Sequence, residues 1–140
     1  RVAVLRPPMV YGKNCRGNFQ TMKKLVEKSP IFPAVKNQRS MISIDNLCSF
    51  VRMAVDRQLN GTFFPQNRQS VNTTHMARII ADQLGRKVRF SPMAGLAVQA
   101  LALVYPTARK AFSSLTYENC EQHGYCYCVE DFEQSVRKSI

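Results

Sequence analysis

The first apolar run of the chain predicts a strand that is buried in a sheet. Residues 1–6 read Arg-Val-Ala-Val-Leu-Arg, which is β-branched and apolar without a helical period. A strand of this kind is typical of a parallel sheet that is covered on both faces. The pair Pro7-Pro8 ends the strand, and Gly12 and Gly17 mark the loop that we expect after it. Because the chain opens directly in a strand, we expect it to be a piece of a longer protein.

Apolar residues at helical spacing then predict five helices. They cover residues 18–28, a stretch that begins at Asp45, a stretch from Thr73 or Thr74 to Gly85, residues 93–104, and residues 130–140. Asn18, Asp45 and one of the two threonines are the expected N-caps, because their side chains can accept from free backbone N–H groups. The helix over 93–104 is apolar all round, so we expect it to be largely buried.

Shorter segments between the helices predict strands over 39–44, 62–64 and 87–90, and Pro30 and Pro33 predict a rigid loop around Ile31-Phe32. Strands that alternate with helices indicate an α/β fold. The 140 residues suit one domain, which we take to be residues 1–140.

Charge adds a preference for anionic partners. The chain has 20 Lys and Arg against 9 Asp and Glu, a net charge of +11. A phosphate-bearing ligand and nucleic acid are both compatible with this charge, but no nucleic-acid-binding motif occurs. The longest apolar stretch is shorter than the roughly 20 residues of a membrane-spanning helix. We therefore expect no membrane and no nucleic acid as partner, and the five unpaired-looking cysteines favour the cytoplasm.

Few residues suggest catalysis or metal binding. The sequence contains neither a Gly-x-Gly-x-x-Gly loop nor a Gly-x-Ser-x-Gly turn, so we expect no catalytic residue in this chain. Cys120, His123, Cys126 and Cys128 are residue types that bind zinc. Tyrosines alternate with two of these thiols as in an ordinary strand, so we predict no metal site. Tyr105 and Arg109 mimic a Tyr-x-x-x-Lys pair, but arginine does not replace the lysine, and we interpret Tyr105 as a packing residue.

Several segments resemble a known family. They are Arg6-Pro7-Pro8-Met9-Val10-Tyr11-Gly12, Gly17-Asn18-Phe19, Ile31-Phe32-Pro33, residues 39–47 and Asn60-Gly61-Thr62-Phe63-Phe64-Pro65-Gln66-Asn67. Together they are similar to the carboxy-terminal half of the NAD-dependent epimerase/dehydratase family, the extended short-chain dehydrogenases that act on nucleotide sugars. The resemblance covers about residues 1–90. Arg-Ser-Met-Ile at 39–42 is similar to epimerases of surface-polysaccharide biosynthesis that use UDP-sugars.

The resemblance implies a role for seven residues. Arg39 would bind the diphosphate of the substrate, Asn18 and Phe19 would touch its nucleotide, and Phe32 would lie near the uracil. The positions that would approach the nicotinamide of NAD are Pro7, Pro8 and Val10. The guanidinium of Arg39 also suits a diphosphate on chemical grounds, because it donates paired charge-assisted hydrogen bonds. Met9 departs from the family, in which many members have an asparagine that contacts the substrate.

The resemblance also implies what the whole enzyme does. It would be a homodimeric UDP-sugar 4-epimerase whose NAD is held mainly by a Rossmann half upstream of Arg1, where the catalytic tyrosine and lysine also lie. This chain would be the carboxy-terminal, substrate-binding fragment of an extended Rossmann-type short-chain dehydrogenase. A 4,6-dehydratase or reductase of the same family remains an alternative, as does a small basic nucleic-acid-binding module. A third alternative is an interaction domain that uses the helix over 93–104.

Overall fold

Three pairs of short parallel strands organise the chain. In the computed structural model, which describes residues 2–104, 106, 112, 114–117 and 125–140, β1 (Ala3–Leu5) pairs with β5 (Gly61–Phe63). The second pair joins β2 (Met9–Tyr11) to β4 (Met41–Ser43), and the third joins β3 (Ile31–Pro33) to β6 (Arg89–Ser91). All three pairs are parallel and are linked through helices, which agrees with the predicted α/β class.

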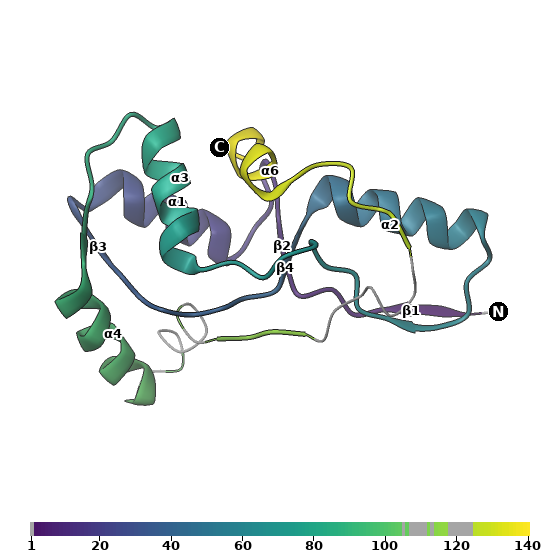
Figure 1. The fold of residues 1–140 in the computed structure, drawn as a ribbon, viewed down its shortest axis with the longest axis horizontal. Coiled ribbons are helices and arrows are strands. Elements are labelled where there is room, and N and C mark those ends of the chain that lie inside the picture. Colours follow the sequence, from purple (N-terminus) through teal and green to yellow (C-terminus); the bar gives the residue numbers. More distant parts are fainter. Residues whose placement is uncertain (1, 105, 107–111, 113, 118–124) are drawn as a thin grey trace.

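The helices cover these strand pairs along an elongated molecule. They are α1 (Asn18–Lys28), α2 (Ile44–Asp56), α3 (Thr73–Gln83), α4 (Pro92–Val104) and α6 (Phe132–Lys138). Helix α3 packs against both α1 and α6, whereas α2 lies beside β1 (Figure 1). Helix α4 packs on β3 at the end of the molecule that is opposite to β1.

The β2–β4 pair separates two hydrophobic clusters. Met41 of β4 packs in a cluster with residues of α1, α3 and α6, and the next residue, Ile42, packs in a second cluster with Phe50 of α2 and Phe63 of β5. Successive side chains of a strand point to opposite faces, so a single short strand can serve both cores. β2 does the same, because Tyr11 belongs to the first cluster and Val10 packs against the second.

The caps of the first three helices differ from the predicted ones by one or two residues. Gly17, and not Asn18, is the N-cap of α1, and it has no side chain with which to cap. Ser43 caps α2 by accepting from Asn46 N at 3.2 Å, so Asp45 is the second residue of the helix and lies in its first turn. Asn72 caps α3 and accepts from Thr74 N at 2.7 Å.

The threonines at the start of α3 do not cap it because their hydroxyl groups have tertiary partners. Thr73 Oγ1 accepts from Asn37 Nδ2 at 2.7 Å, and Thr74 Oγ1 donates to Val35 O at 2.9 Å. Both partners are more than thirty residues away in the chain. Local capping preference therefore yields here to contacts that the sequence pattern does not reveal.

Two short strands were not predicted. The segment expected as a rigid loop, Ile31-Phe32, is part of β3, and the segment after Pro7-Pro8 contains β2. Pro30 and Pro33 are compatible with β3 because they stand at its ends, where Pro30 O still accepts from Arg89 N at 2.9 Å. Each strand has three residues, which is too short for a period-2 pattern to be recognised.

Two predictions of burial are wrong. Val2 is 69% exposed and Val4 of β1 is 42% exposed, although residues 1–6 were expected to form a buried strand. Within the described residues, β1 pairs on one side only, with β5. In α4 the buried residue is Gly95, whereas Leu103 is 88% exposed. The last helix is also shorter than predicted, but it keeps the expected acids at its start and Arg137 and Lys138 at its end.

Candidate functional site

Arg39 and Asn18 meet at one small cavity between α1, β2 and β4. The cavity has a volume of about 150 Å³. The residues that line it include Met9, Asn18, Met22, Arg39, Met41 and Phe112. Its wall is mainly apolar, and the guanidinium of Arg39 is its cationic group. Thr21 also lines the cavity. The family resemblance implied Arg39 and Asn18 as substrate contacts, and the fold brings them together from positions that are 21 residues apart.

The backbone holds Arg39 in a fixed place. Its N–H donates to Val71 O at 2.9 Å, and its carbonyl accepts from Val71 N at 2.8 Å. The next residue, Ser40, donates its N–H to Leu115 O at 2.8 Å. Arg39 therefore lies between two neighbouring segments, as a residue in the middle of a sheet does.

Burial gives Arg39 an electrostatic character suited to an anion. The residue is 6% exposed, and this desolvation lowers the pKa of Arg39 from its ordinary value. An arginine side chain nevertheless stays charged in a protein. A cation in such an apolar, water-poor place attracts an anion much more strongly than a cation on the surface does.

The amino-terminal end of α1 adds a second favourable contribution. Asn18 is the first residue of α1, and the first turn of this helix contains no acidic residue. The N-cap Gly17 has a φ of 123°, a backbone conformation that favours glycine, and no side chain satisfies the first N–H groups there. The partial positive charge of a helix start favours a negatively charged ligand.

The side chains of Phe19 and Phe32 lie in the core instead of the cavity. Phe19 is buried with its ring centroid 5.6 Å from that of Tyr11. Phe32 is fully buried, with centroid distances of 5.8 Å to Phe90 and 6.3 Å to Phe112. Phe112 itself lines the cavity, so Phe32 is separated from it by one ring.

The residues predicted to approach NAD lie beside this site. Pro7 and Pro8 connect β1 to β2, and Val10 is the middle residue of β2. Met9, between them, lines the cavity. The chain offers no glycine-rich turn at the start of a helix that would hold the pyrophosphate of a dinucleotide. These residues do not form a complete cofactor site by themselves, and their contact with NAD stays a prediction.

A second cavity is larger but has the wrong charge for a diphosphate. It measures about 380 Å³ and lies between residues 67–69 and the segment before α6. Glu130 and Asp131 are part of its wall. Arg68 also lines it, but the two carboxylates outnumber this cation and disfavour a phosphate group, so the smaller cavity at Arg39 is the better candidate of the two.

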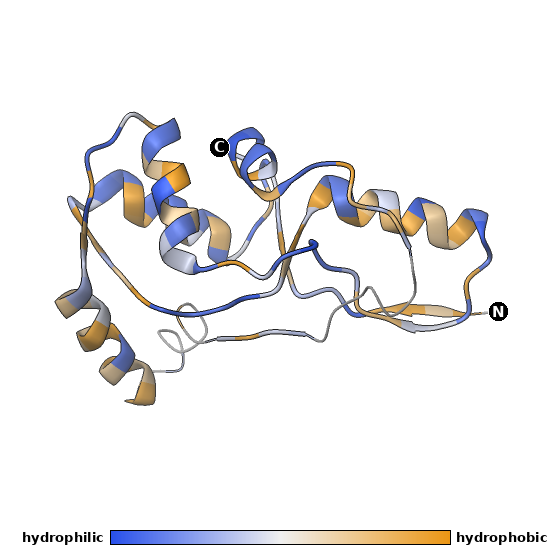
Figure 2. Cartoon of the chain, in the orientation of Figure 1, coloured by the Kyte–Doolittle hydropathy of each residue, from blue (hydrophilic) through white to orange (hydrophobic). Residues whose placement is uncertain are grey.

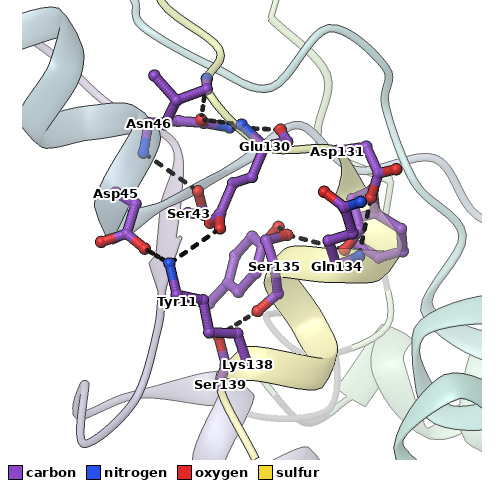
Figure 3. A network of polar contacts seen from close by, with 12 residues as sticks. Tyr11, Ser43, Asp45, Asn46, Glu130, Asp131, Gln134, Ser135, Lys138 and Ser139 are labelled. Atoms are coloured by element: carbon purple, nitrogen blue, oxygen red, sulfur yellow. Dashed lines mark hydrogen bonds and ion pairs between the residues drawn. The ribbon is translucent and has the colours of Figure 1, made fainter.

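A buried polar network beside the second cavity was not predicted from the sequence (Figure 3). Tyr11 OH lies 2.5 Å from Ser135 Oγ and accepts from Asn67 Nδ2 at 2.9 Å. Burial of the phenol raises the pKa of Tyr11 to about 12, against an ordinary value of 10.0. Burial therefore keeps Tyr11 neutral, although its hydrogen bonds to Ser135 and Asn67 act in the opposite direction, and the network joins β2 to α6.

Asn46 continues this network on the other side of β4. It is fully buried on α2, and its Oδ1 accepts from Val129 N at 2.8 Å. Its Nδ2 donates to Asn67 Oδ1 at 2.9 Å. In the sequence, Asn46 stands on the apolar face of the predicted helix. A polar residue at such a position indicates a buried hydrogen-bond partner, but the sequence does not show which residue it is.

No metal site is found in the part of the chain that the structure describes, where no group of three or more His, Cys, Asp or Glu residues is close enough to hold an ion. Cys120, His123, Tyr105 and Arg109 lie outside the described residues, whereas Cys126 is exposed, with its sulfur 3.6 Å from Arg68 Nη2. Among the described residues, no helix is both long and apolar enough to cross a membrane.

Comparison with known proteins places this geometry in context. No family model matches the sequence. Over 90 residues, which are 61% of this chain and 27% of the relative, the sequence is 31% identical to a UDP-glucose 4-epimerase from Vibrio cholerae. The chain is related to this sugar epimerase. It spans about a quarter of the length of that relative.

Solved structures share the fold. A dTDP-4-dehydrorhamnose reductase from Clostridium acetobutylicum superposes with a TM-score of 0.71 and 17% identity, over 98% of this chain and 47% of the other. A UDP-glucuronic acid 4-epimerase from Bacillus cereus, solved with NAD, superposes with a TM-score of 0.66 and 11% identity, over 98% of this chain and 42% of the other. These matches confirm the predicted fold class: α/β with parallel strands, corresponding to less than half of a Rossmann-type short-chain dehydrogenase.

Proposed function

We propose that this chain binds the nucleotide diphosphate of a UDP-sugar for an NAD-dependent sugar 4-epimerase. The observation that carries the proposal is the shared cavity of Arg39 and Asn18, since the family resemblance implies that both residues contact the substrate. The relation to a UDP-glucose 4-epimerase supports the class of substrate. The whole enzyme would be a cytoplasmic homodimer in surface-polysaccharide biosynthesis, with its catalytic residues and the main NAD site upstream of Arg1.

The cavity suits one part of this substrate. Its volume of about 150 Å³ is below the roughly 300–1,000 Å³ of most ligand pockets, so it accommodates a diphosphate but not an entire nucleotide sugar. The fork of Arg39 would donate two parallel hydrogen bonds to phosphate oxygens. The start of α1 would add its partial positive charge, and Asn18 would donate from its side-chain amide.

The other predicted contacts take indirect roles in this proposal. Phe19 would anchor the start of α1 in the core, and Phe32 would support the ring of Phe112 on the cavity wall. Met9 would contribute an apolar contact where many family members have an asparagine. Pro7, Pro8 and Val10 would present only their backbone toward the nicotinamide. Bound NAD would supply hydride transfer, and this chain would orient the substrate.

Substitution of Arg39 by methionine tests the proposal without leaving a hole in the core. Arg39→Met replaces a buried cation by an unbranched, flexible apolar side chain that fills much of the same space. We expect the affinity for UDP, measured by isothermal titration calorimetry with the 140-residue chain, to fall more than tenfold. We expect the melting temperature to stay within a few degrees of that of the unchanged chain.

A matched control separates this effect from a loss of net charge. Arg52 lies on α2 with a side chain that is 86% exposed, so Arg52→Met removes the same charge away from the cavity. This variant should bind UDP as the unchanged chain does. Equal UDP affinity of Arg39→Met and the unchanged chain, or no UDP binding by the folded unchanged chain, would contradict the proposal.

A further inference from the structure

Helix α4 is built with its small residues inside and its large apolar residues outside. The least exposed residues of α4, which packs on β3, are Ala94, Gly95, Val98 and Ala102, and they follow one stripe of the helix. A Cβ atom on Gly95 would lie 1.9 Å from Ala34 O, so the helix touches the backbone of the chain there. The outward side carries Met93, Leu96, Leu101, Leu103 and Val104, which are between 49% and 88% exposed.

The outward side contains almost no polar group. None of the 13 residues of α4 is charged, and Gln99 is its only polar side chain. Figure 2 shows α4 hydrophobic along most of its length, in contrast to the mixed colours of α1 and α3. A helix that is apolar all round is normally covered by protein or by lipid. Single exposed leucines need no explanation, but a contiguous set on one helix does.

A cationic cavity lies beside the first turn of this helix. It measures about 360 Å³, and Pro92, the first residue of α4, forms part of its wall. Lys36 and Arg78 line the same cavity and are both exposed. His75 also lines it, but its Nε2 lies 3.9 Å from Glu133 Oε1, so we do not count it among the cations that face a ligand.

Basic residues also flank α4 in the sequence. Arg86, Lys87 and Arg89 precede it and are exposed, and Arg109 and Lys110 follow it. Basic residues beside an inserting apolar helix add electrostatic attraction to an anionic membrane surface. A length of 13 residues, about 20 Å, is too short to span a bilayer but suits a helix in its interface.

The area of the helix argues against a second copy of the chain as the cover. Half of a cylinder about 10 Å wide and 20 Å long offers roughly 300 Å². Each partner in a stable protein complex normally contributes about 800 Å², with one hydrogen bond for every 100–200 Å². Gln99 alone cannot supply such hydrogen bonds, whereas a lipid surface requires none from the inserted side chains.

We propose that α4 is a membrane-surface element, which inserts its outward apolar side into the headgroup region of an anionic bilayer while Lys36 and Arg78 bind lipid phosphate. This goes beyond the proposed nucleotide-sugar function and does not depend on it, because α4 and the Arg39 cavity can be tested separately. It also differs from the expectation that the chain has no membrane partner. That expectation rested on the length needed to span a bilayer, which surface association does not require.

Binding to lipid vesicles tests the proposal. The 140-residue chain should sediment with vesicles of equal parts phosphatidylcholine and phosphatidylglycerol, and bind at least tenfold more weakly to vesicles of phosphatidylcholine alone. The double variant Leu96→Gln, Leu103→Gln should bind the anionic vesicles about tenfold more weakly or worse, because each substitution removes apolar surface that would be buried in the lipid. Lys36→Ala, Arg78→Ala should weaken binding to the anionic vesicles only.

A matched control uses the opposite end of the molecule. Val55 on α2 is 70% exposed and lies far from α4, so Val55→Gln should bind vesicles as the unchanged chain does. Circular dichroism melts of all variants verify that they fold, which is expected because the substituted side chains are exposed. Equal binding of the Leu96→Gln, Leu103→Gln variant and the Val55→Gln variant would overturn the proposal, as would equal binding to both kinds of vesicle.

The absence of tryptophan from the chain allows a direct measurement of insertion. Leu103→Trp introduces a single fluorophore at an exposed position. Its emission should shift to shorter wavelength when anionic vesicles are added, whereas the emission of Val55→Trp should not change. A shift of Leu103→Trp that appears without vesicles and grows with protein concentration would show a second copy as the cover and would overturn the proposal.

Discussion

The hydroxyl group of Tyr11 links elements that are far apart in the sequence. It connects β2 to Ser135 of α6 and to Asn67, 124 and 56 residues away along the chain. Because all three side chains are buried, each hydrogen bond replaces contacts with water that folding removes. Nothing in the local sequence predicts this, since a tyrosine in a strand is compatible with both a buried and an exposed hydroxyl.

Removal of this hydroxyl should destabilise the fold at neutral pH. Tyr11→Phe keeps the ring but leaves the amide of Asn67 without its partner, so the free energy of unfolding should fall by about 1–3 kcal/mol. Urea denaturation followed by circular dichroism measures this change. Tyr117→Phe, which keeps the ring contact of Tyr117 with Phe64, should change the value by less than half as much.

The same residue predicts a pH dependence at alkaline pH. In the unfolded chain Tyr11 ionises near pH 10, whereas in the folded chain burial raises its pKa to about 12. The neutral phenol therefore contributes stability that is complete below pH 10 and is lost as the pH rises through 12, about 3 kcal/mol in all. Tyr11→Phe should lack this part of the alkaline loss. Parallel stability curves for both proteins from pH 9 to 12 would contradict the prediction.

Among the elements, α4 depends on a single glycine for its contact with the sheet. Helix propensity alone favours alanine over glycine by about 1 kcal/mol. At residue 95, however, a methyl group would lie 1.9 Å from Ala34 O, and a backbone atom cannot move away as a flexible side chain can. The contact between α4 and β3 thus overrides the local preference.

Gly95→Ala should therefore lower the stability of the chain although it improves the helix. We expect the melting temperature to fall, because overpacked sites of this kind lower the free energy of unfolding by about 1–3 kcal/mol. Gln99→Ala, an exposed substitution in the same helix, should leave it unchanged or raise it slightly. A melting temperature of Gly95→Ala at or above that of the unchanged chain would show that α4 does not pack on β3 in this way.

At the scale of the whole molecule, stability should be uneven between the strand pairs. All three residues of β4 are buried between the two hydrophobic clusters, whereas two of the three residues of β1 are exposed. Regions with few buried apolar contacts open with a smaller free energy than the core does. The β1–β5 pair should therefore open more readily than the centre of the molecule.

Hydrogen exchange of two matched amides tests this difference. Arg6 N–H donates to Phe63 O at 2.9 Å beside the β1–β5 pair, and Asn67 N–H donates to Met41 O at 2.8 Å beside β4. The hydrogen bonds have nearly equal lengths, so a difference in protection reflects opening of the surroundings. We expect the Arg6 amide to be at least tenfold less protected by NMR. Equal protection would mean that the chain opens as one unit.

The sequence by itself determined the features that depend on neighbouring residues. Apolar spacing located the helices, and the alternation of strands and helices indicated the α/β class. Each of these follows from a local pattern, because a helix or a motif is written in consecutive residues. The role of Arg39 as a substrate contact stays a prediction.

Tertiary structure alone decided which surfaces are covered. Residues 1–6 and α4 are apolar enough to be buried, yet Val2 and Leu103 are exposed, because burial requires a second element on that side. The caps at Ser43 and Asn72, the strand β3 and the network of Tyr11 likewise depend on partners that are distant in the chain. Such long-range pairing has no local period, and for that reason only the folded chain reveals it.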